Sequence, residues 1–410
     1  MILIEILIGV LLGFVIGLIP SVHINTISYF FIFIGGYELL YNNSHFFISL
    51  AVSQLITSYV SVSAFGVPND STIMHLFPLQ RLSKEGKLKK GVYLCLVGSF
   101  FGGVFSLLLF PVLYLLFSTL FNFNLFIYGL IILILIMFVI LENTFRKRLA
   151  IVAIIILCGV LGIFTLKYNY YISEPLMVCI VGLFAFPFIL ESIFSKTKFI
   201  IQKDQDMQLN FKETSISSFL GTVGSLFMIL IPSFSSSQAS LLISKIKTKI
   251  DTDEYLIIFS SVAISALFFS FFLAINFYKP RLGYIAILLS NNIIGNSISN
   301  FNLGLTLFLS LCLSVILVSL FYKQIIDIIS RFNLRIINIS LIFFILLLII
   351  VLFGIKAVPL LILSTIIGFL PLVFGVDRVI LMSYIMIPTI LFYIWFSCSK
   401  IKHSSYYPWF

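Results

Sequence analysis

Residues 17–26 read GLIPSVHINT, and residues 229–238 read ILIPSFSSSQ. Each stretch interrupts an apolar run with a proline that is followed by small polar residues. One gap-free shift along the sequence, which we call the repeat shift, places Pro20 on Pro232 and also places Pro68 on Pro280. Proline has no amide hydrogen and interrupts the hydrogen-bond ladder of a helix. The repeat shift therefore predicts two related halves, each with a discontinuous helix.

The composition predicts a membrane protein. The chain has 410 residues, of which 61% are hydrophobic and only 10% are charged, and its mean hydropathy is +1.19. A soluble domain is about 25% charged, so a water-soluble fold is excluded. Because a membrane helix needs about 20 apolar residues, the chain has room for about 11–14 membrane segments. We predict an all-α, polytopic protein of the cell membrane, embedded in the lipid bilayer.

The apolar runs and the polar interruptions give the expected organisation. We expect a first transmembrane repeat at 1–195, a charged central linker at 196–213 and a second transmembrane repeat at 214–410, with the two repeats inverted. The apolar runs fall at about 2–19, 46–65, 92–118, 124–141, 149–166, 174–194, 214–232, 254–277, 283–299, 302–322, 336–355, 357–375 and 379–397.

The net charge of +10 lies mostly in short loops. Such Lys/Arg-rich loops are typical of the cytoplasmic side of a membrane protein and do not indicate a nucleic-acid partner. Lys279 and Arg281 fit this alternation poorly. The five cysteines are scattered without a CxxC spacing, so the sequence predicts neither a metal site nor a disulfide framework. The basic loops are 81–90, 146–148, 196–212, 245–249 and 323–335.

The first break offers several hydrogen-bonding side chains within six residues. A helix that ends near Pro20 and restarts near Asn25 would aim backbone N–H groups at the gap. Freed backbone groups inside a bilayer must be satisfied by protein or by water in a cavity. We interpret this break as half of a solute or ion site. The alternative is a proline kink satisfied by hydroxyl groups. The candidates are Pro20, Ser21, His23, Asn25 and Thr26.

The second-half counterpart, residues 232–240, contains five serines and one glutamine but no charge. Neutral donors and acceptors of this kind suit an ion or a carboxylate that must bind weakly enough to leave again. A serine-rich loop is the alternative. We expect His23 and Asn25 to converge with this segment on one cavity. The candidates are Pro232, Ser233, Ser235, Ser236, Ser237 and Gln238.

Two further breaks carry charge. The first, with candidates Gly66, Pro68, Asp70 and Thr72, is compatible with cation or proton binding by Asp70, and equally with an N-cap for the next helix. The other break contains Arg281, whose planar guanidinium suits a carboxylate. The alternative for Arg281 is an anchor in the lipid headgroups.

Enzyme signatures are poor. The chain has no HExxH, no GxSxG and no nucleotide-binding P-loop. Residues 204–206 and 251–253 both read Asp-x-Asp, a pattern that suits metal–nucleotide binding in a lipid-linked glycosyltransferase. Both lie in charged loops where aspartate is common. We predict no enzymatic activity and no cofactor, apart from a coupling Na⁺ or H⁺.

At these breaks the chain resembles the permease subunit of the tripartite tricarboxylate transporters, the TctA family, and in particular its archaeal branch. The branch has a Leu-Pro-Gly-x-His-x-Asn-Thr element that residues 19–26 match, with Ser21 in place of glycine. Its Gly-x-Pro element with an acidic residue and a threonine is similar to residues 66–72. Its second-half Pro-Gly element looks like residues 232–239, with Ser233 in place of glycine.

Two later elements extend the resemblance, which runs from about residue 9 to residue 385. A Lys-x-Arg-Ser-Gly turn looks like residues 279–283. A final Pro-x-x-x-Gly-x-x-Arg-x-x-x-Met element is similar to Pro371, Gly375, Arg378 and Met382.

The resemblance implies a secondary active transporter that moves a small organic anion, a carboxylate, across the membrane. It also implies a small membrane subunit and an extracytoplasmic binding protein as partners. The alternative function is a lipid-carrier translocase for polyprenyl-phosphate or a membrane scaffold. A closed central cavity favours a solute, whereas a groove open to lipid favours the lipid carrier.

Overall fold

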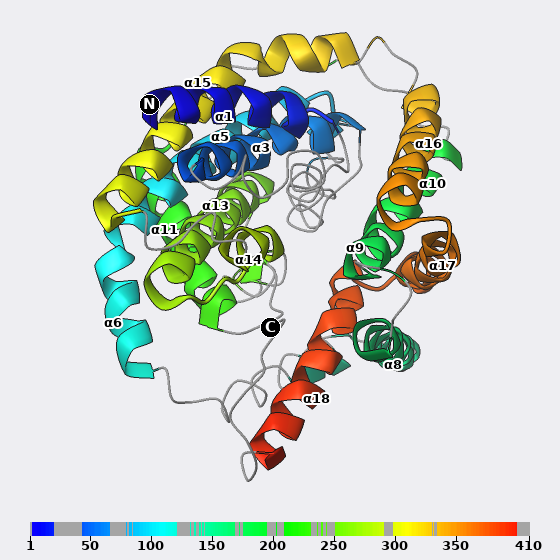
Figure 1. Ribbon diagram of the computed structural model, residues 1–410. Helices are drawn as coiled ribbons and strands as arrows, with labels where there is room; N and C mark the ends of the chain where they lie inside the picture. The colour runs from blue at the N-terminus through cyan, green and yellow to red at the C-terminus, as the bar shows by residue number, and fades with distance from the viewer. Residues whose placement is uncertain are drawn as a thin grey trace.

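The computed structural model of the chain is built of helices, turns and loops, with no strand in the residues that it describes (Figure 1). Six described helices are long and apolar enough to cross a membrane, and further described helices are apolar but shorter. The predicted class, all-α and polytopic, is confirmed. The structure describes residues 2–19, 43–65, 79, 82–83, 85–120, 132, 135–136, 139–140, 142, 144–168, 172, 175–194, 202, 209–230, 236, 239–240, 243, 251–290, 298–329, 331 and 334–399.

The helices form two groups, which lie at the left and at the right of Figure 1. The first group contains α1 (Ile2–Gly17), α3 (Ser44–Phe65), α5 (Leu88–Leu108), α6 (Phe110–Leu120), α11 (Phe211–Leu230), α13 (Thr252–Phe277), α14 (Gly283–Ser290) and α15 (Asn300–Ile329). The second contains α8 (Phe145–Tyr168), α9 (Pro175–Ile180), a π-helical turn (Val181–Ala185), α10 (Phe186–Phe194), α16 (Leu334–Phe353), α17 (Ala357–Phe374), a 3₁₀ turn (Arg378–Met382) and α18 (Ser383–Ser399).

Helices α1, α3 and α15 run side by side in the same direction. Ser53 and Ser61 of α3 donate hydrogen bonds to the carbonyls of Val10 and Gly17 of α1. Between α3 and α15, His45 pairs with Thr306, and Ser310 donates to Ser49. In each case the residue numbers rise together along the two helices, so the helices are parallel.

Helices α11, α13 and α5 form a second parallel set. Ser261 and Ser265 of α13 donate hydrogen bonds to the carbonyls of Gly98 and Gly102 of α5. Ser217 of α11 donates to Glu254 at the start of α13. This set runs opposite to the first, because α5 and α15 are antiparallel.

The antiparallel crossing of α5 and α15 is fixed by two contacts. Lys89, at the start of α5, forms an ion pair with Asp327 near the end of α15. Further along α5, Gly103 faces Leu311, which is nearer the start of α15. Each set therefore takes two helices from one half of the chain and one helix from the other half.

Positions that the repeat shift relates occupy equivalent places in the two sets. A Cβ atom at Gly9 would lie 2.5 Å from the Phe46 carbonyl oxygen, and one at Gly221 would lie 2.5 Å from the Ile258 carbonyl oxygen. Helices α3 and α13 end at Phe65 and Phe277, which the same shift also relates. Because a side chain at either glycine would collide with backbone, both helix pairs can pack this closely only with glycine there.

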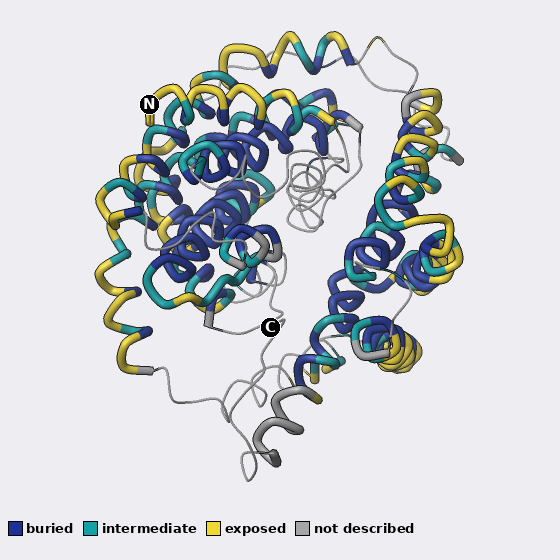
Figure 2. Tube along the Cα trace, in the orientation of Figure 1, coloured by how far each residue is buried: buried dark blue, intermediate teal, exposed yellow. Residues whose placement is uncertain are grey.

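The central helices of the two sets, α3 and α13, are buried along nearly their whole length, whereas α1 and α15 each expose one face (Figure 2). Burial does not follow hydropathy here, because α3 contains six serines, a threonine and a glutamine. Their hydroxyls donate mostly to carbonyls of α3 itself or of neighbouring helices, which removes most of the cost of burying them.

The run predicted at 92–118 is two helices rather than one. Helix α5 ends at Leu108, and α6 starts at Phe110, directly before Pro111. The amide of Leu109 donates to both the Phe105 and the Ser106 carbonyls, which closes α5 with a tightened turn. Proline is tolerated in the first turn of a helix but not in its interior, so the chain restarts the helix at this point.

Two prolines within the helices of the second group have similar surroundings. Pro187 and Pro388 free the carbonyls four residues earlier, those of Leu183 and Tyr384. A Cβ atom at Gly368 of α17 would lie 2.3 Å from the Leu183 oxygen, and one at Gly162 of α8 would lie 2.0 Å from the Tyr384 oxygen. Each freed carbonyl thus faces a glycine of the helix packed against it, where a Cα–H group can approach.

Candidate functional site

Most of the predicted site residues lie outside the described residues, while the helix ends that border them are described. Of the predicted set, Ser236 and Arg281 are described. The remaining ones lie outside: Pro20, Ser21, His23, Asn25, Thr26, Gly66, Pro68, Asp70, Thr72, Pro232, Ser233, Ser235, Ser237 and Gln238.

Helix α1 ends in a tightened turn directly before Pro20. The amides of Leu18 and Ile19 donate to the carbonyls of Val15 and Ile16, at 3.3 Å and 3.0 Å, which tightens the last turn. The Ile16 carbonyl would otherwise need the amide hydrogen that Pro20 lacks. Ser61 of α3 then donates to the Gly17 carbonyl at 2.7 Å. The carbonyls at the end of α1 are therefore satisfied by its own last turn and by its neighbour.

The described part of the second break packs beside α11. Ser236 is only 4% exposed, and Ser240 donates to the Ser236 carbonyl at 2.7 Å, the spacing of a helical turn. The side chain of Ile243 fills the space in front of Gly224 of α11. The described serines of this break, Ser236 and Ser240, are thus buried beside the first helix group.

Sequence reasoning missed the polar character of α3. Gln54 and Ser58 are 4% and 2% exposed, and they share one face of the helix. Their neighbour Thr57 faces Gly17 at the end of α1. This polar face therefore lies next to the first break. The signal was available, because the run 46–65 carries more Ser, Thr and Gln than the equivalent run 254–277.

Arg281 lies in a tight turn between α13 and α14. Tyr278 adopts a left-handed conformation with φ of 53°, and its amide donates to the Leu273 carbonyl. The turn brings Lys279 close to Arg281. Partial burial, and secondarily the positive charge of Arg281, lower the pKa of Lys279 to about 8. Two cations held together just before the first turn of α14 form an electropositive corner that favours an anion.

The opposite end of the first helix group carries the basic loops. Helices α5, α11 and α13 begin there and α15 ends there, and each of these ends borders one of the basic loops. The turn of Lys279 and Arg281 lies at the other end, because it follows the C-terminus of α13. This explains why these two residues do not fit the alternation of basic loops in the sequence.

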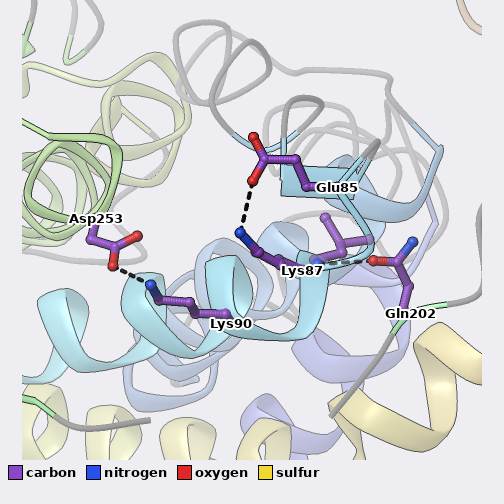
Figure 3. A network of polar contacts seen from close by, with 6 residues as sticks. Glu85, Lys87, Lys90, Gln202 and Asp253 are labelled. Carbon is purple, nitrogen blue, oxygen red and sulfur yellow. Dashed lines mark hydrogen bonds and ion pairs between the residues drawn. The ribbon is translucent and has the colours of Figure 1, made fainter. Parts of the chain in front are cut away.

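Ion pairs and one glutamine organise the start of α5 (Figure 3). Lys87 lies 3.1 Å from Glu85, and Lys90 pairs with Asp253 of α13. Gln202 accepts the amide hydrogen of Leu88 at 2.9 Å. Lysines at a helix N-terminus oppose the helix dipole, so nearby carboxylates are needed to offset them. The carboxylates at this end therefore compensate the positive charges of the lysines.

The Asp-x-Asp pattern at 251–253 has a structural role. Asp251 caps α13 by accepting the amide hydrogen of Glu254 at 2.8 Å, and Asp253 pairs with Lys90. No group of three or more His, Cys, Asp or Glu side chains suited to a metal ion occurs among the described residues. Residues 204–206 lie outside them.

The final predicted element is centred on a buried arginine. Arg378 is 4% exposed and donates to Glu191 of α10 at 2.8 Å. Gly375 ends α17 in a left-handed conformation with φ of 62°, which turns the chain toward Arg378. Sequence reasoning did not find Glu191, because 187 residues separate the two partners.

Comparison with known proteins identifies the family of the chain. The profile of the tripartite tricarboxylate transporter TctA family matches residues 3–383. An uncharacterized protein of Methanocaldococcus jannaschii is 28% identical over 272 residues, which are 65% of this chain and 67% of that relative. No solved structure matches. Because the family profile spans nearly the whole chain, the chain belongs to the tripartite tricarboxylate transporter TctA family.

Proposed function

We propose that the chain is a secondary carrier that moves a small organic anion, a carboxylate, across the cell membrane, and that Na⁺ or H⁺ drives it. The family establishes the coarser statement: the chain is a multi-pass membrane protein and a permease component of a tripartite tricarboxylate transporter. The substrate class, the coupling ion and the residues that bind them are the proposal.

The observation that carries the proposal is the pair of helix ends before Pro20 and Pro232. Helices α1 and α11 run in opposite directions within two sets that the repeat shift relates. We propose that residues 1–195 and 214–410 are inverted repeats joined by 196–213. Inverted repeats with discontinuous helices are the architecture of many secondary transporters, in which the broken helices bind the solute and the coupling ion.

The two breaks supply complementary chemistry in this proposal. His23, Asn25, Ser235, Ser237 and Gln238 provide neutral hydrogen-bonding groups for a carboxylate that has to be released again. A solute site built from neutral groups accommodates an anion without fixing it permanently. Asp70, at a third break, is assigned to the coupling cation.

Arg281 and Lys279 take the role of attracting the anion in this proposal. Their turn lies at the end opposite the basic loops, and Lys/Arg-rich loops mark the cytoplasmic side. The pair would then face outward, where a solute arrives. The family's tripartite organisation supports two partners, an extracytoplasmic binding protein that delivers the solute and a small membrane subunit.

Thermal unfolding of the purified full chain with a series of carboxylates tests the proposal. We expect citrate or another di- or tricarboxylate to raise Tm, and Na⁺ or a lower pH to enlarge the rise. Acetate and sulfate at equal ionic strength are the controls. Asn25→Ala and Ser237→Ala should reduce the rise, while Ser319→Ala, on an exposed part of α15, should leave it unchanged. Equal shifts with all anions would reject a carboxylate site.

A further inference from the structure

Near the start of α3, one histidine is held by α15. His45 Nδ1 lies 2.6 Å from Thr306 Oγ1, a short hydrogen bond. Thr306 is 1% exposed, and His45 is partly buried. The next turn repeats the contact between the same helices, because Ser310 donates to Ser49 at 2.8 Å. The imidazole is therefore fixed in position by a well-packed helix pair.

The hydrogen bonds around Thr306 determine which nitrogen of His45 carries the proton. Thr306 Oγ1 donates its single hydrogen to the Asn302 carbonyl at 2.8 Å. The hydroxyl can then only accept from His45, so Nδ1 must be protonated. In the neutral imidazole this leaves Nε2 without a hydrogen. Nε2 is the atom that takes up a proton when the pH falls.

Glu5 of α1 provides the negative charge for that proton. Helices α1 and α3 are parallel, and Gly9 packs against Phe46 and Ser49, so Glu5 lies one turn earlier at the level of His45. Burial of the imidazole, the larger effect, disfavours its charged form, and the Glu5 carboxylate opposes this electrostatically. Its Oε2 atom is buried and accepts no hydrogen bond from any described residue. The first turn of α1 also favours a negative charge, because the helix N-terminus is electropositive.

The equivalent positions of the other parallel set carry different residues. The repeat shift relates Glu5, His45 and Thr306 to Ser217, Ile257 and Leu94. Elsewhere these two sets share serine-to-carbonyl contacts and close glycine packing. Packing, which the two sets share, does not explain why one set carries an acid, an imidazole and a hydroxyl at these positions and the other does not.

We propose that Glu5, His45 and Thr306 form a proton-binding site at the end of the helix group opposite the basic loops. One proton binds to His45 Nε2 and is stabilised by the Glu5 carboxylate, while Thr306 keeps Nδ1–H in place. If the chain is the ion-coupled carrier proposed above, this site binds H⁺ as a coupling ion, in addition to the cation assigned to Asp70. That last step rests on the proposed function, whereas proton binding itself does not.

Among the described residues, few other charges lie at this end. Between Asn300 and Tyr322, α15 has no acidic or basic residue, and Glu5 is the only one in α1. Asn276 of α13 meets α15 through Asn300, at 2.8 Å, and contributes no charge. Lys279 and Arg281 follow α13 at the same end and oppose a positive imidazole. The Glu5 carboxylate is the charge that favours it.

Nuclear magnetic resonance of the full chain with ¹³C- and ¹⁵N-labelled histidine tests the site directly. The chain has four histidines, and His45→Gln identifies the signal of His45. We expect this signal to titrate as the pH is lowered, with a midpoint that the Glu5 carboxylate holds higher than it would otherwise be. Its neutral form should carry the hydrogen on Nδ1. Glu5→Gln should move the midpoint to lower pH, because the anion that stabilises the imidazolium is lost.

Two further variants test whether the shift of the midpoint and the position of the hydrogen are specific to this site. Glu85→Gln removes an exposed acid at the opposite end and should leave the midpoint unchanged. Thr306→Val should abolish the preference for Nδ1–H, because the acceptor is gone. A His45 signal that shows no titration, or a midpoint that Glu5→Gln leaves in place, overturns the proposal.

The coupling step has its own readout. In a Lys279→Arg background, where the other pH-dependent charge is fixed, citrate should raise Tm by different amounts at pH 6 and pH 8, and adding His45→Gln should make the two amounts equal. A pH-dependent rise that persists when His45→Gln is added to Lys279→Arg overturns the assignment of H⁺ coupling to this site. If citrate gives no rise in either protein at either pH, the proposed carboxylate function fails, and the magnetic resonance titration still decides whether the proton site exists.

Discussion

Ser61 of α3 donates a hydrogen bond of 2.7 Å to the carbonyl oxygen of Gly17, the last residue of α1. The contact lies directly before Pro20 and joins the end of α1 to a neighbour that is buried along nearly its whole length. Because the last carbonyls of a helix have no partner within it, a neighbouring hydroxyl at this place decides how the helix can end. The geometry of the proposed solute site depends on this helix end.

Ser61→Ala should lower the free energy of unfolding by about 1 kcal/mol, because the buried Gly17 carbonyl loses its donor. The matched control is Ser63→Ala. Ser63 donates to the Val60 carbonyl of its own helix at 2.8 Å, so its removal should cost less. Thermal unfolding of both variants measures the difference. Equal losses would mean that the end of α1 does not depend on Ser61.

Gly98→Ala should disrupt the packing of α5 against α13. The added Cβ atom would lie 2.5 Å from the Ile257 carbonyl oxygen, and backbone cannot move aside cheaply. We expect a large fall in the yield of folded protein and in Tm. Gly304→Ala on α15 is the control, because nothing lies within 4 Å of its added Cβ atom. Gly304→Ala should leave the free energy of unfolding unchanged or raise it by up to about 1 kcal/mol, because alanine has a higher helix propensity than glycine.

The ion pair of Lys89 and Asp327 should respond asymmetrically to mutation. The Lys89 side chain is 5% exposed, whereas that of Asp327 is 47% exposed. Asp327→Asn leaves a buried cation without its anion and should lower Tm clearly, while Lys89→Met leaves a half-exposed carboxylate and should cost less. The double variant should recover much of the loss of Asp327→Asn. A larger loss for Lys89→Met than for Asp327→Asn would contradict this reasoning.

Anion binding should weaken as the pH rises through about 8. The pKa of Lys279 is lowered to about 8 by partial burial and by Arg281, so its charge is present below this pH and lost above it. Citrate titrations between pH 7 and 9 measure the effect. Lys279→Arg should remove the pH dependence, because arginine stays charged throughout. A pH dependence that persists in Lys279→Arg would assign it to another group.

Arg281 should contribute through its charge. Arg281→Lys should retain part of the transport of citrate into proteoliposomes, and Arg281→Gln should lose it. Asp70→Asn should change the dependence on Na⁺ or pH more than the affinity for the solute. Normal transport by Arg281→Gln would show that the arginine is a headgroup anchor and that neutral groups hold the anion.

The sequence predicted those features that depend on local pattern. The apolar runs predict α1, α3, α11 and α13, and Pro20 correctly predicts the end of α1, because a missing amide hydrogen acts within one turn. The sequence did not predict that α5 packs with helices of the second half and α15 with helices of the first half. This packing depends on contacts such as that of Ser265 with Gly102, which lie 163 residues apart. The break at Leu109 was missed because Pro111 lies within a continuous apolar run.

The candidate site rests on the same local signals and stays a prediction, because most of its residues lie outside the described ones. Proline followed by small polar residues marks a helix break, and a charged pair such as Lys279 and Arg281 stands out in apolar sequence. The buried polar face of Gln54 and Ser58 was missed. The sequence alone does not show which polar residues of an apolar run share a helical face or which helices they contact. Glu191 was missed for a similar reason, since its partner Arg378 is distant in sequence.

The central claim is that the breaks after Pro20 and after Pro232 bind one solute together. Cysteine labelling with solute protection tests this most directly. Asn25→Cys and Ser237→Cys are introduced singly into a chain whose native cysteines are replaced, and Ser319→Cys on α15 is the control. The reaction of each with a maleimide is followed with and without citrate. The account predicts that citrate slows labelling at both positions 25 and 237 and leaves position 319 unchanged. Protection at only one break, or at neither, would contradict it.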